Sequence, residues 1–87
     1  SGQLPEAIRQ FEELLRENPR LANAHAALAS ACLAVGDRSR AIQEFQAELR
    51  VNPATVPARL NLATLLAQSH PDEAERLLQE AAERSPD

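Results

Sequence analysis

The spacing of apolar side chains along the chain predicts five short α-helices. Apolar residues recur at intervals of three and four positions, which places them along one face of a helix. The expected helices lie within residues 1–20, 21–35, 37–51, 55–67 and 72–84. Each helix is expected to bury one face against a neighbour. The apolar positions are Ala7, Ile8, Phe11, Leu14 and Leu15 in the first helix, Leu28 and Cys32 in the second, Ala41, Ile42, Phe45 and Leu49 in the third, and Leu62, Leu65 and Leu66 in the fourth.

Turn residues separate the predicted helices. The dipeptides Asn18-Pro19 and Asn52-Pro53 end two of them, because the residue before a proline is pushed out of the α region. Gly36 supplies the positive φ angle at which many helices end. The expected N-caps are Asp37 or Ser39 for the third helix and Thr55 for the fourth, whose first turn holds Pro57.

The chain repeats its own pattern at an interval of 34 residues. Without a gap, eight residues recur: Gly2, Ala7, Ile8, Phe11, Leu15, Arg16, Asn18 and Pro19 match Gly36, Ala41, Ile42, Phe45, Leu49, Arg50, Asn52 and Pro53. Likewise, His25-x2-Leu28-Ala29-x2-Cys32 matches Arg59-x2-Leu62-Ala63-x2-Leu66. Beyond residue 68 the interval is 33, and Ala74, Leu78 and Pro86 match Ala41, Phe45 and Pro53. An array of similar helical hairpins is therefore predicted.

An interval of 34 residues with Ala-x3-Phe and a late proline is typical of the tetratricopeptide repeat (TPR) family. The chain resembles that family in Leu28-Ala29-x2-Cys32, Ala41-x3-Phe45 and Pro53. It departs from the pattern at His25, Ala29 and Cys32, where the family usually has Trp, Gly and Tyr. The resemblance implies an all-α, right-handed superhelical solenoid of antiparallel helix hairpins, with five helices in about two and a half repeats. Residues 1–20 are then the second helix of a partial repeat, and 21–54 and 55–87 are full repeats of a single domain spanning 1–87.

The order of the predicted helices suggests a fragment of a longer repeat array. The chain opens on a second helix without its first, and it closes on a linker at 85–87 without a polar capping helix. Terminal repeats normally need such a cap to cover their apolar surface. We therefore expect the exposed array ends to favour self-association.

Composition limits the partners that the chain can bind. Thirteen acidic residues stand against nine arginines, and the net charge is −4. Nucleic acids and anionic membranes require a basic surface, so neither is expected as a partner. No apolar run approaches the roughly 20 residues of a membrane span, so membrane insertion is not expected. With two Phe and no Trp, Tyr or Met, the core must consist mainly of leucine and alanine.

The residues that could carry chemistry are few and scattered. Cys32, the single cysteine, cannot form an internal disulfide and is expected to be a small core residue; the alternative is a reactive thiol. His25 lies seven residues away, about 10 Å along the same helix, which is too far for a catalytic hydrogen bond. His70, Asp72 and Glu73 come nearest to a metal site but fall in a turn, where we expect them to be solvated. We therefore expect no enzyme, no cofactor and no metal, with the cytoplasm as the default compartment.

Charged side chains crowd the first, third and fifth predicted helices. The pairs Glu12–Arg16, Asp72–Arg76 and Glu80–Arg84 have the i,i+4 spacing of ion pairs along one helix. Their expected place is a solvated helix face.

The second and fourth predicted helices carry an uncharged face opposite their apolar stripe. If Leu28 and Cys32 point at the neighbouring helix, the helical period places neutral side chains on the other side. The candidate groove residues are Asn23, Ala26, Ala27, Ser30, Ala34, Leu60, Asn61, Thr64 and Gln68. The resemblance implies that these faces line the concave side of the superhelix, where TPR proteins hold an extended peptide or a partner helix.

The resemblance thus implies a protein–protein interaction module, an adaptor or scaffold segment that binds another protein or peptide in this groove. The alternative is a structural spacer or self-association segment of a larger multidomain protein or enzyme, in which the small residues serve only packing between repeats. Some TPR co-chaperones hold a partner's terminal carboxylate with Lys, Asn and Arg. Because this chain has no lysine and neither face has an arginine, we expect no such clamp.

Overall fold

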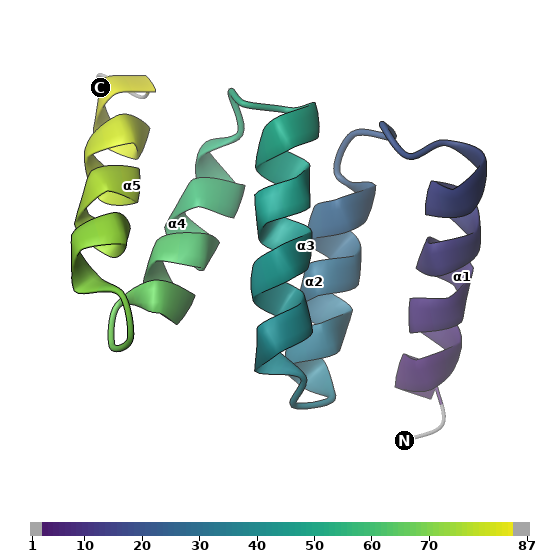
Figure 1. The fold of residues 1–87 in the computed structure, drawn as a ribbon. Coiled ribbons are helices and arrows are strands. Elements are labelled where there is room, and N and C mark those ends of the chain that lie inside the picture. Colours follow the sequence, from purple (N-terminus) through teal and green to yellow (C-terminus); the bar gives the residue numbers. More distant parts are fainter. Residues whose placement is uncertain (1–2, 85–87) are drawn as a thin grey trace.

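The computed structural model describes residues 3–84, which form five α-helices and no strand. The helices are α1 (Gln3–Glu17), α2 (Ala24–Ala34), α3 (Arg38–Val51), α4 (Val56–Leu66) and α5 (Pro71–Arg84). Each helix packs on the helices next to it in the chain, and α1 and α5 stand at opposite ends (Figure 1). The predicted all-α class and the five helices are confirmed. Gly2 and the linker with Pro86 lie outside the described residues.

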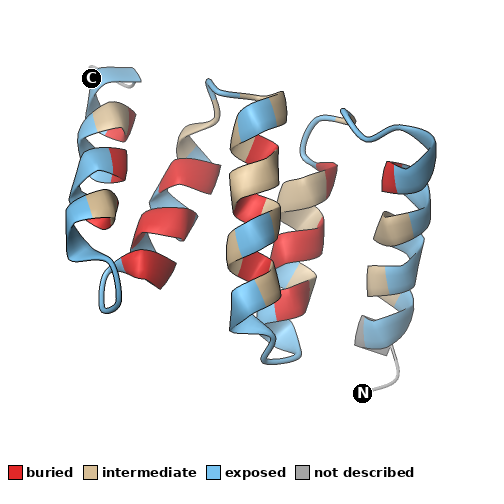
Figure 2. Cartoon of the chain, viewed as in Figure 1, coloured by how far each residue is buried: buried red, intermediate tan, exposed pale blue. Residues whose placement is uncertain are grey.

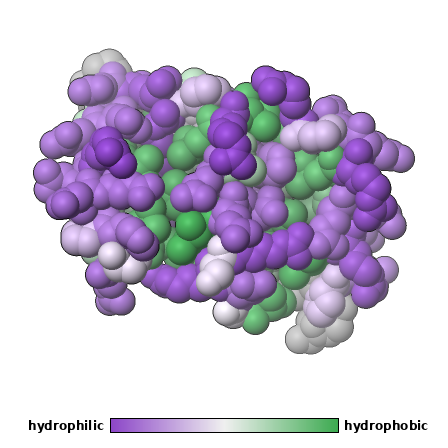
Figure 3. Space-filling model, in the orientation of Figure 1, coloured by the Kyte–Doolittle hydropathy of each residue, from purple (hydrophilic) through white to green (hydrophobic). Residues whose placement is uncertain are grey.

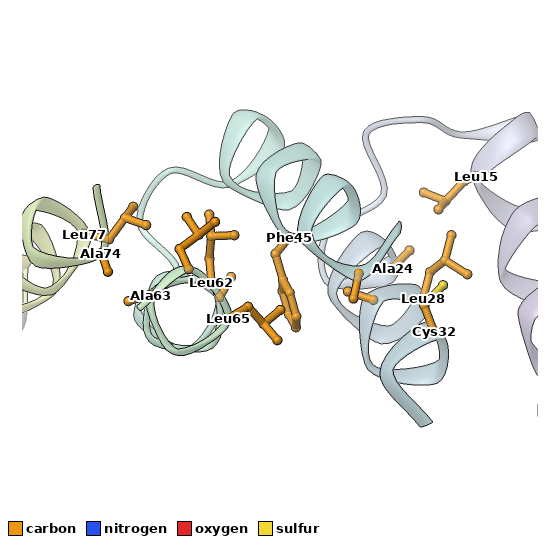
Figure 4. Packing of buried hydrophobic residues seen from close by; sticks show 14 residues of the cluster. Leu15, Ala24, Leu28, Cys32, Phe45, Leu62, Ala63, Leu65, Ala74 and Leu77 are labelled. Atoms are coloured by element: carbon orange, nitrogen blue, oxygen red, sulfur yellow. The ribbon is translucent and has the colours of Figure 1, made fainter. Parts of the chain in front are cut away.

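The core lies between the helices and consists mainly of leucine and alanine. Buried positions fall on the sides of the helices that face one another (Figure 2). The positions matched across the repeat are buried alike: Leu28, Ala29 and Cys32 are 2%, 0% and 1% exposed, and Leu62, Ala63 and Leu66 are 2%, 2% and 3% exposed. The Phe45 ring extends from α3 toward Leu65 of α4 (Figure 4) and is 1% exposed. The predicted apolar stripes of α2, α3 and α4 are therefore confirmed.

The α2–α3 turn forms as the sequence predicts. Gly36 has a φ angle of 86°, and its N–H donates to the Leu33 carbonyl at 3.0 Å. The next N–H, that of Asp37, donates to the Cys32 carbonyl at 2.8 Å. These two bonds define a Schellman motif, which satisfies carbonyls left free at the end of α2. The Asp37 side chain then caps α3 by accepting from the Arg40 N–H at 3.1 Å.

One helix start and one helix cap differ from the prediction. The second helix begins at Ala24 and not at Leu21, because Asn23 adopts a left-handed φ angle of 71° that a helix cannot contain. Thr55 does precede α4, but its side chain makes no capping hydrogen bond. The predicted position of this cap is correct and its expected chemistry is wrong. Pro57 does lie in the first turn of α4.

The end helices bury less apolar surface than their stripes predict. Leu14 on α1 is 46% exposed, and Leu78 on α5 is 49% exposed although its counterpart Phe45 is buried. Phe11 is only half-buried. The matched positions Phe11, Phe45 and Leu78 therefore differ in burial, because α3 has packed neighbours on two sides whereas α1 packs mainly on α2 and α5 on α4. Among the described helices, none has the length and apolar character needed to cross a membrane.

Candidate functional site

The nine candidate groove residues lie on or beside α2 and α4, and most of them reach solvent. Asn23 precedes α2 as its N-cap, and Gln68 lies in the α4–α5 turn. Ala26 and Ala27 are half-buried, and Ala26 packs against the core. The exposed members are Asn23, Ser30, Ala34, Leu60, Asn61, Thr64 and Gln68. The helical period therefore predicted correctly that seven of the nine side chains are exposed, whereas Ala26 and Ala27 are half-buried.

The two halves of this set do not form an enclosed pocket. Helices α2 and α4 both pack on α3, and each belongs to a different hairpin. No pocket is found in the part of the chain that the structure describes. Small-molecule sites are usually concave and largely enclosed. The exposed faces of α2 and α4 are therefore open surface and not the lining of a cavity.

The exposed surfaces of α2 and α4 carry no charge, because the histidine of α2 and the arginine of α4 turn inward. Helix α2 has no lysine or arginine, and the side chain of its one histidine, His25, is 16% exposed. Arg59 is the only charged residue on α4, and its side chain is 8% exposed. Hydrophilic side chains cover most of the face seen in Figure 3, with hydrophobic ones between them in the region of α4. Each of the two uncharged surfaces has charged helices as neighbours, because α2 packs on α1 and α3, and α4 packs on α3 and α5.

His25 and Arg59 occupy matched positions and make matched contacts. The Nε2 atom of His25 lies 2.9 Å from the carbonyl oxygen of Pro19, six residues earlier. Arg59 donates to the carbonyl of Pro53, which is also six residues earlier. Each also reaches a glutamate on the following helix: Nδ1 of His25 lies 2.8 Å from Glu44, and Nε of Arg59 lies 3.3 Å from Glu80. In both hairpins, a polar side chain therefore ties the preceding turn to the following helix.

The expected ion pairs along single helices do not form among the described residues. Glu12 instead accepts from Arg40 across α1 and α3, with 2.5 Å between Oε2 and Nη2. Glu80 pairs with Arg59 across α4 and α5. For Glu12 and Glu80, a cation on the neighbouring helix takes the place of the expected partner. Asp72 and Arg76 are both exposed, in agreement with the expected solvated face. The sequence indicated a shared role for these positions, since His25 and Arg59 are matched across the interval of 34 residues and both are polar.

Glu48 is a buried carboxylate that the sequence interpretation missed. It is 0% exposed, and its two oxygens accept from the N–H groups of Asn23 and Ala26 at 2.9 and 3.0 Å. It therefore caps the N-terminus of α2 from α3. The spacing of residues could have predicted this burial, because Glu48 lies three residues after Phe45 and seven after Ala41, on the apolar stripe of its helix.

Polar groups on the candidate surface are partly engaged already. The Thr64 hydroxyl donates to the Leu60 carbonyl one turn earlier at 2.9 Å. The Asn23 side chain makes no capping bond. Asn23, Ser30, Asn61 and Gln68 are therefore the side chains that can offer hydrogen bonds to a partner.

Cys32 has the surroundings of an inert core thiol. It is 1% exposed, and burial raises its pKa; nearby Asp37, Glu44 and Glu12 raise it further, against the opposing effect of Arg40. Because the thiolate is the reactive form, a raised pKa lowers reactivity at neutral pH. Within residues 3–84, no three His, Cys, Asp or Glu side chains are grouped so that they could hold a metal ion.

We predict that Cys32 of the folded protein reacts with a disulfide reagent at pH 8 more than about tenfold more slowly than in the unfolded chain. The measurement is the rate of absorbance increase with 5,5′-dithiobis(2-nitrobenzoate), with and without denaturant. Equal rates would show an accessible thiol and would favour the alternative of a reactive cysteine.

The family predicted from the sequence is compatible with this arrangement. Successive helical hairpins with matched buried positions are common to helical arrays in general, so they do not single out the TPR family. In comparisons with known proteins, no family model matches this chain and no curated protein matches its sequence.

Proposed function

We propose that this chain is a protein–protein interaction module, an adaptor or scaffold segment of TPR-like architecture. Its partner is a peptide or helix bound along the neutral faces of α2 and α4. A right-handed superhelical stacking of the hairpins would bring these faces to the concave side of the array. The observation that carries the proposal is the absence of exposed charge on α2 and α4, beside three helices rich in charge.

The physical case rests on the cost of removing water from a surface. Neutral and small side chains lose little when a partner covers them, whereas an unpaired charge loses its hydration. Interface centres are accordingly poor in charged residues. Ser30 and Ala34 leave room for a partner's backbone, and Asn61 and Gln68 can hydrogen-bond to it. The net charge of −4 opposes binding to nucleic acid.

A structural role is the second candidate, and the end helices support it. Leu14 on α1 and Leu78 on α5 are 46% and 49% exposed. Exposed leucines on opposite ends suit end-to-end contact between copies or with further helices. In this case the neutral faces of α2 and α4 would bind nothing.

We predict that replacing Ser30 and Asn61 together with arginine lowers the affinity for a bound peptide about 10–100-fold. The new side chains are bulky, and their charges would lose hydration under the partner. The probe is a set of peptides selected from a random displayed library on the immobilised native protein. Affinity is measured by calorimetry, and the fold is checked by circular dichroism.

The matched control is the pair Gln43→Arg and Gln79→Arg, which places the same side chains at exposed neutral positions on α3 and α5. Peptide binding should survive in this control. Loss of binding in both double variants would point to a general charge effect and contradict the proposed surface. If Leu14→Ser and Leu78→Ser change the sedimentation coefficient while no library peptide binds, the structural role is favoured.

A further inference from the structure

The ring of His25 lies between two acceptors that have no hydrogen to donate. Its Nδ1 is 2.8 Å from Oε1 of Glu44, and its Nε2 is 2.9 Å from the Pro19 carbonyl. A neutral imidazole has one N–H and can donate to only one of them. The protonated ring has two N–H groups and satisfies both. The geometry around His25 therefore fits the imidazolium form.

These two bonds join parts of the chain that are far apart in sequence. Pro19 lies in the turn after α1, His25 in the first turn of α2, and Glu44 in the middle of α3. The side chains of His25 and Glu44 are only 16% and 18% exposed, which shields the pair from water. A second link, between Glu12 and Arg40, ties α1 to α3 directly. The hydrogen bond to Glu12 raises the pKa of Arg40, which therefore stays charged.

The charges around His25 are mainly negative. Glu44 contacts it directly, and Arg40 Nε lies 3.8 Å from the other Glu44 oxygen. Glu48 lies beside it, bonded to the N–H groups of Asn23 and Ala26. Glu12 follows beyond Arg40 on α1, Arg20 is exposed in the α1–α2 turn, and α2 itself carries no other charge. Glu48 also offsets the positive end of the α2 dipole, which would otherwise disfavour a cation there.

We propose that His25 is a proton-dependent latch that fastens the α1–α2 turn to α3. When the ring is protonated it holds both Pro19 and Glu44, and when it loses its proton one of these bonds is lost. The inference is independent of the proposed partner surface. Histidine is the side-chain type that ordinarily changes its charge between pH 5 and 8, so pH 5.5 and pH 8.5 are the two conditions to compare.

The second hairpin carries the same latch in a form that does not titrate. Arg59 stands at the position matched to His25 and donates to both the Pro53 carbonyl and Glu80. Arginine stays protonated at every pH that a folded protein meets. The pH response is therefore confined to the first hairpin. The variant His25→Arg should convert the first latch into the second type.

The sign of the pH effect follows from the bonds. Loss of the proton removes a hydrogen bond from the folded chain, while the unfolded chain has no such bond to lose. The stability that these two hydrogen bonds supply is therefore fully present at low pH and is partly lost as the pH rises. We expect the melting temperature of the native protein to be about 4–8 °C lower at pH 8.5 than at pH 5.5, the effect of losing one hydrogen bond of average strength in a domain of this size.

Thermal unfolding followed by circular dichroism at 222 nm tests this directly. His25→Arg should melt at nearly the same temperature at both pH values. The melting temperature of His25→Gln should also be independent of pH, and at pH 5.5 it should be lower than that of the native protein. His70→Gln is the matched control, because the hydrogen-bond partner of His70 is the Ser69 hydroxyl, which can donate or accept. This control should keep the full difference. Hydrogen-exchange protection factors in α1 should fall at pH 8.5 relative to those in α5.

Two results would overturn the latch. One is a native melting temperature that is equal at both pH values, and the other is a His25→Arg protein that keeps the full difference. Should the variants fail to fold, ¹⁵N spectra of the histidine rings in the native protein decide the matter. The latch requires both His25 ring nitrogens to carry protons at pH 5.5, and a single neutral tautomer at that pH would rule it out.

Discussion

Replacing Phe45 with alanine should unfold most of the chain. Phe45 is 1% exposed and is the largest side chain among the fully buried residues, and it extends from α3 to α4 (Figure 4). Loss of a buried phenylalanine costs about 3–5 kcal/mol, because the lost transfer energy adds to the cost of the cavity. Below roughly 70–80 residues a single core rarely supplies more than about 3–5 kcal/mol in total, and this chain of 87 residues is only slightly longer. Helical circular dichroism at 222 nm, measured against urea concentration, should show little or no folded baseline.

The matched position on α5 is the control. Leu78 is 49% exposed, so Leu78→Ala should change the free energy of unfolding by less than about 0.5 kcal/mol. Phe11→Ala should fall between the two, because Phe11 is half-buried. If Phe45→Ala melts like the native protein, or if Leu78→Ala is equally damaging, the centre of the core is not at Phe45.

Much of this fold follows from interactions within a few residues of the chain. The apolar stripes on α2 and α4 are set by the helical period, and the positions of Leu28 and Leu62 in them were predicted correctly. The α2–α3 turn depends on Gly36, which adopts a positive φ angle without strain, and on Asp37, which caps the helix that follows. Local rules predict such features because every atom involved lies within one turn of its partner.

Contacts between distant residues were not predictable in the same way. The start of α2 depends on Glu48, a residue 25 positions after Asn23 along the chain. Leu14 and Leu78 satisfy the apolar period, yet their burial depends on whether a neighbouring helix lies against them. A periodic pattern shows which face is apolar, but it does not show what covers that face.

The candidate surface combines both kinds of information. The exposure of Ser30, Asn61 and Thr64 follows from their place opposite the apolar stripe. The absence of exposed charge on α2 and α4 depends also on the inward direction of His25 and Arg59, which the structure alone reveals. Their partners, Glu44 and Glu80, lie 19 and 21 residues further along the chain. The neutrality of the surface is therefore a property of the fold as much as of composition.

Glu48→Ala should destabilise the protein by about 2–5 kcal/mol, a large effect for the loss of a charged residue. The carboxylate is 0% exposed and bonds to the N–H groups of Asn23 and Ala26, which would lose their partners and remain partly buried. It also lies at the positive end of the α2 dipole, where a negative charge is favourable. Urea unfolding measures the loss, and faster hydrogen exchange at Asn23 and Ala26 places it at the start of α2.

Glu48→Gln separates the charge from the shape of the side chain. The amide keeps one acceptor oxygen but turns an NH₂ group toward an N–H donor, so about 1–3 kcal/mol should still be lost. Glu75→Gln makes the same change at an exposed position on α5 and should cost less than about 0.5 kcal/mol. If Glu48→Gln is as stable as the native protein, then only the volume of the side chain matters and the carboxylate does not hold α2 in place. If Glu48→Ala and Glu48→Gln both lose stability, and hydrogen exchange at Asn23 and Ala26 speeds up first, the start of α2 depends on a charge supplied from α3.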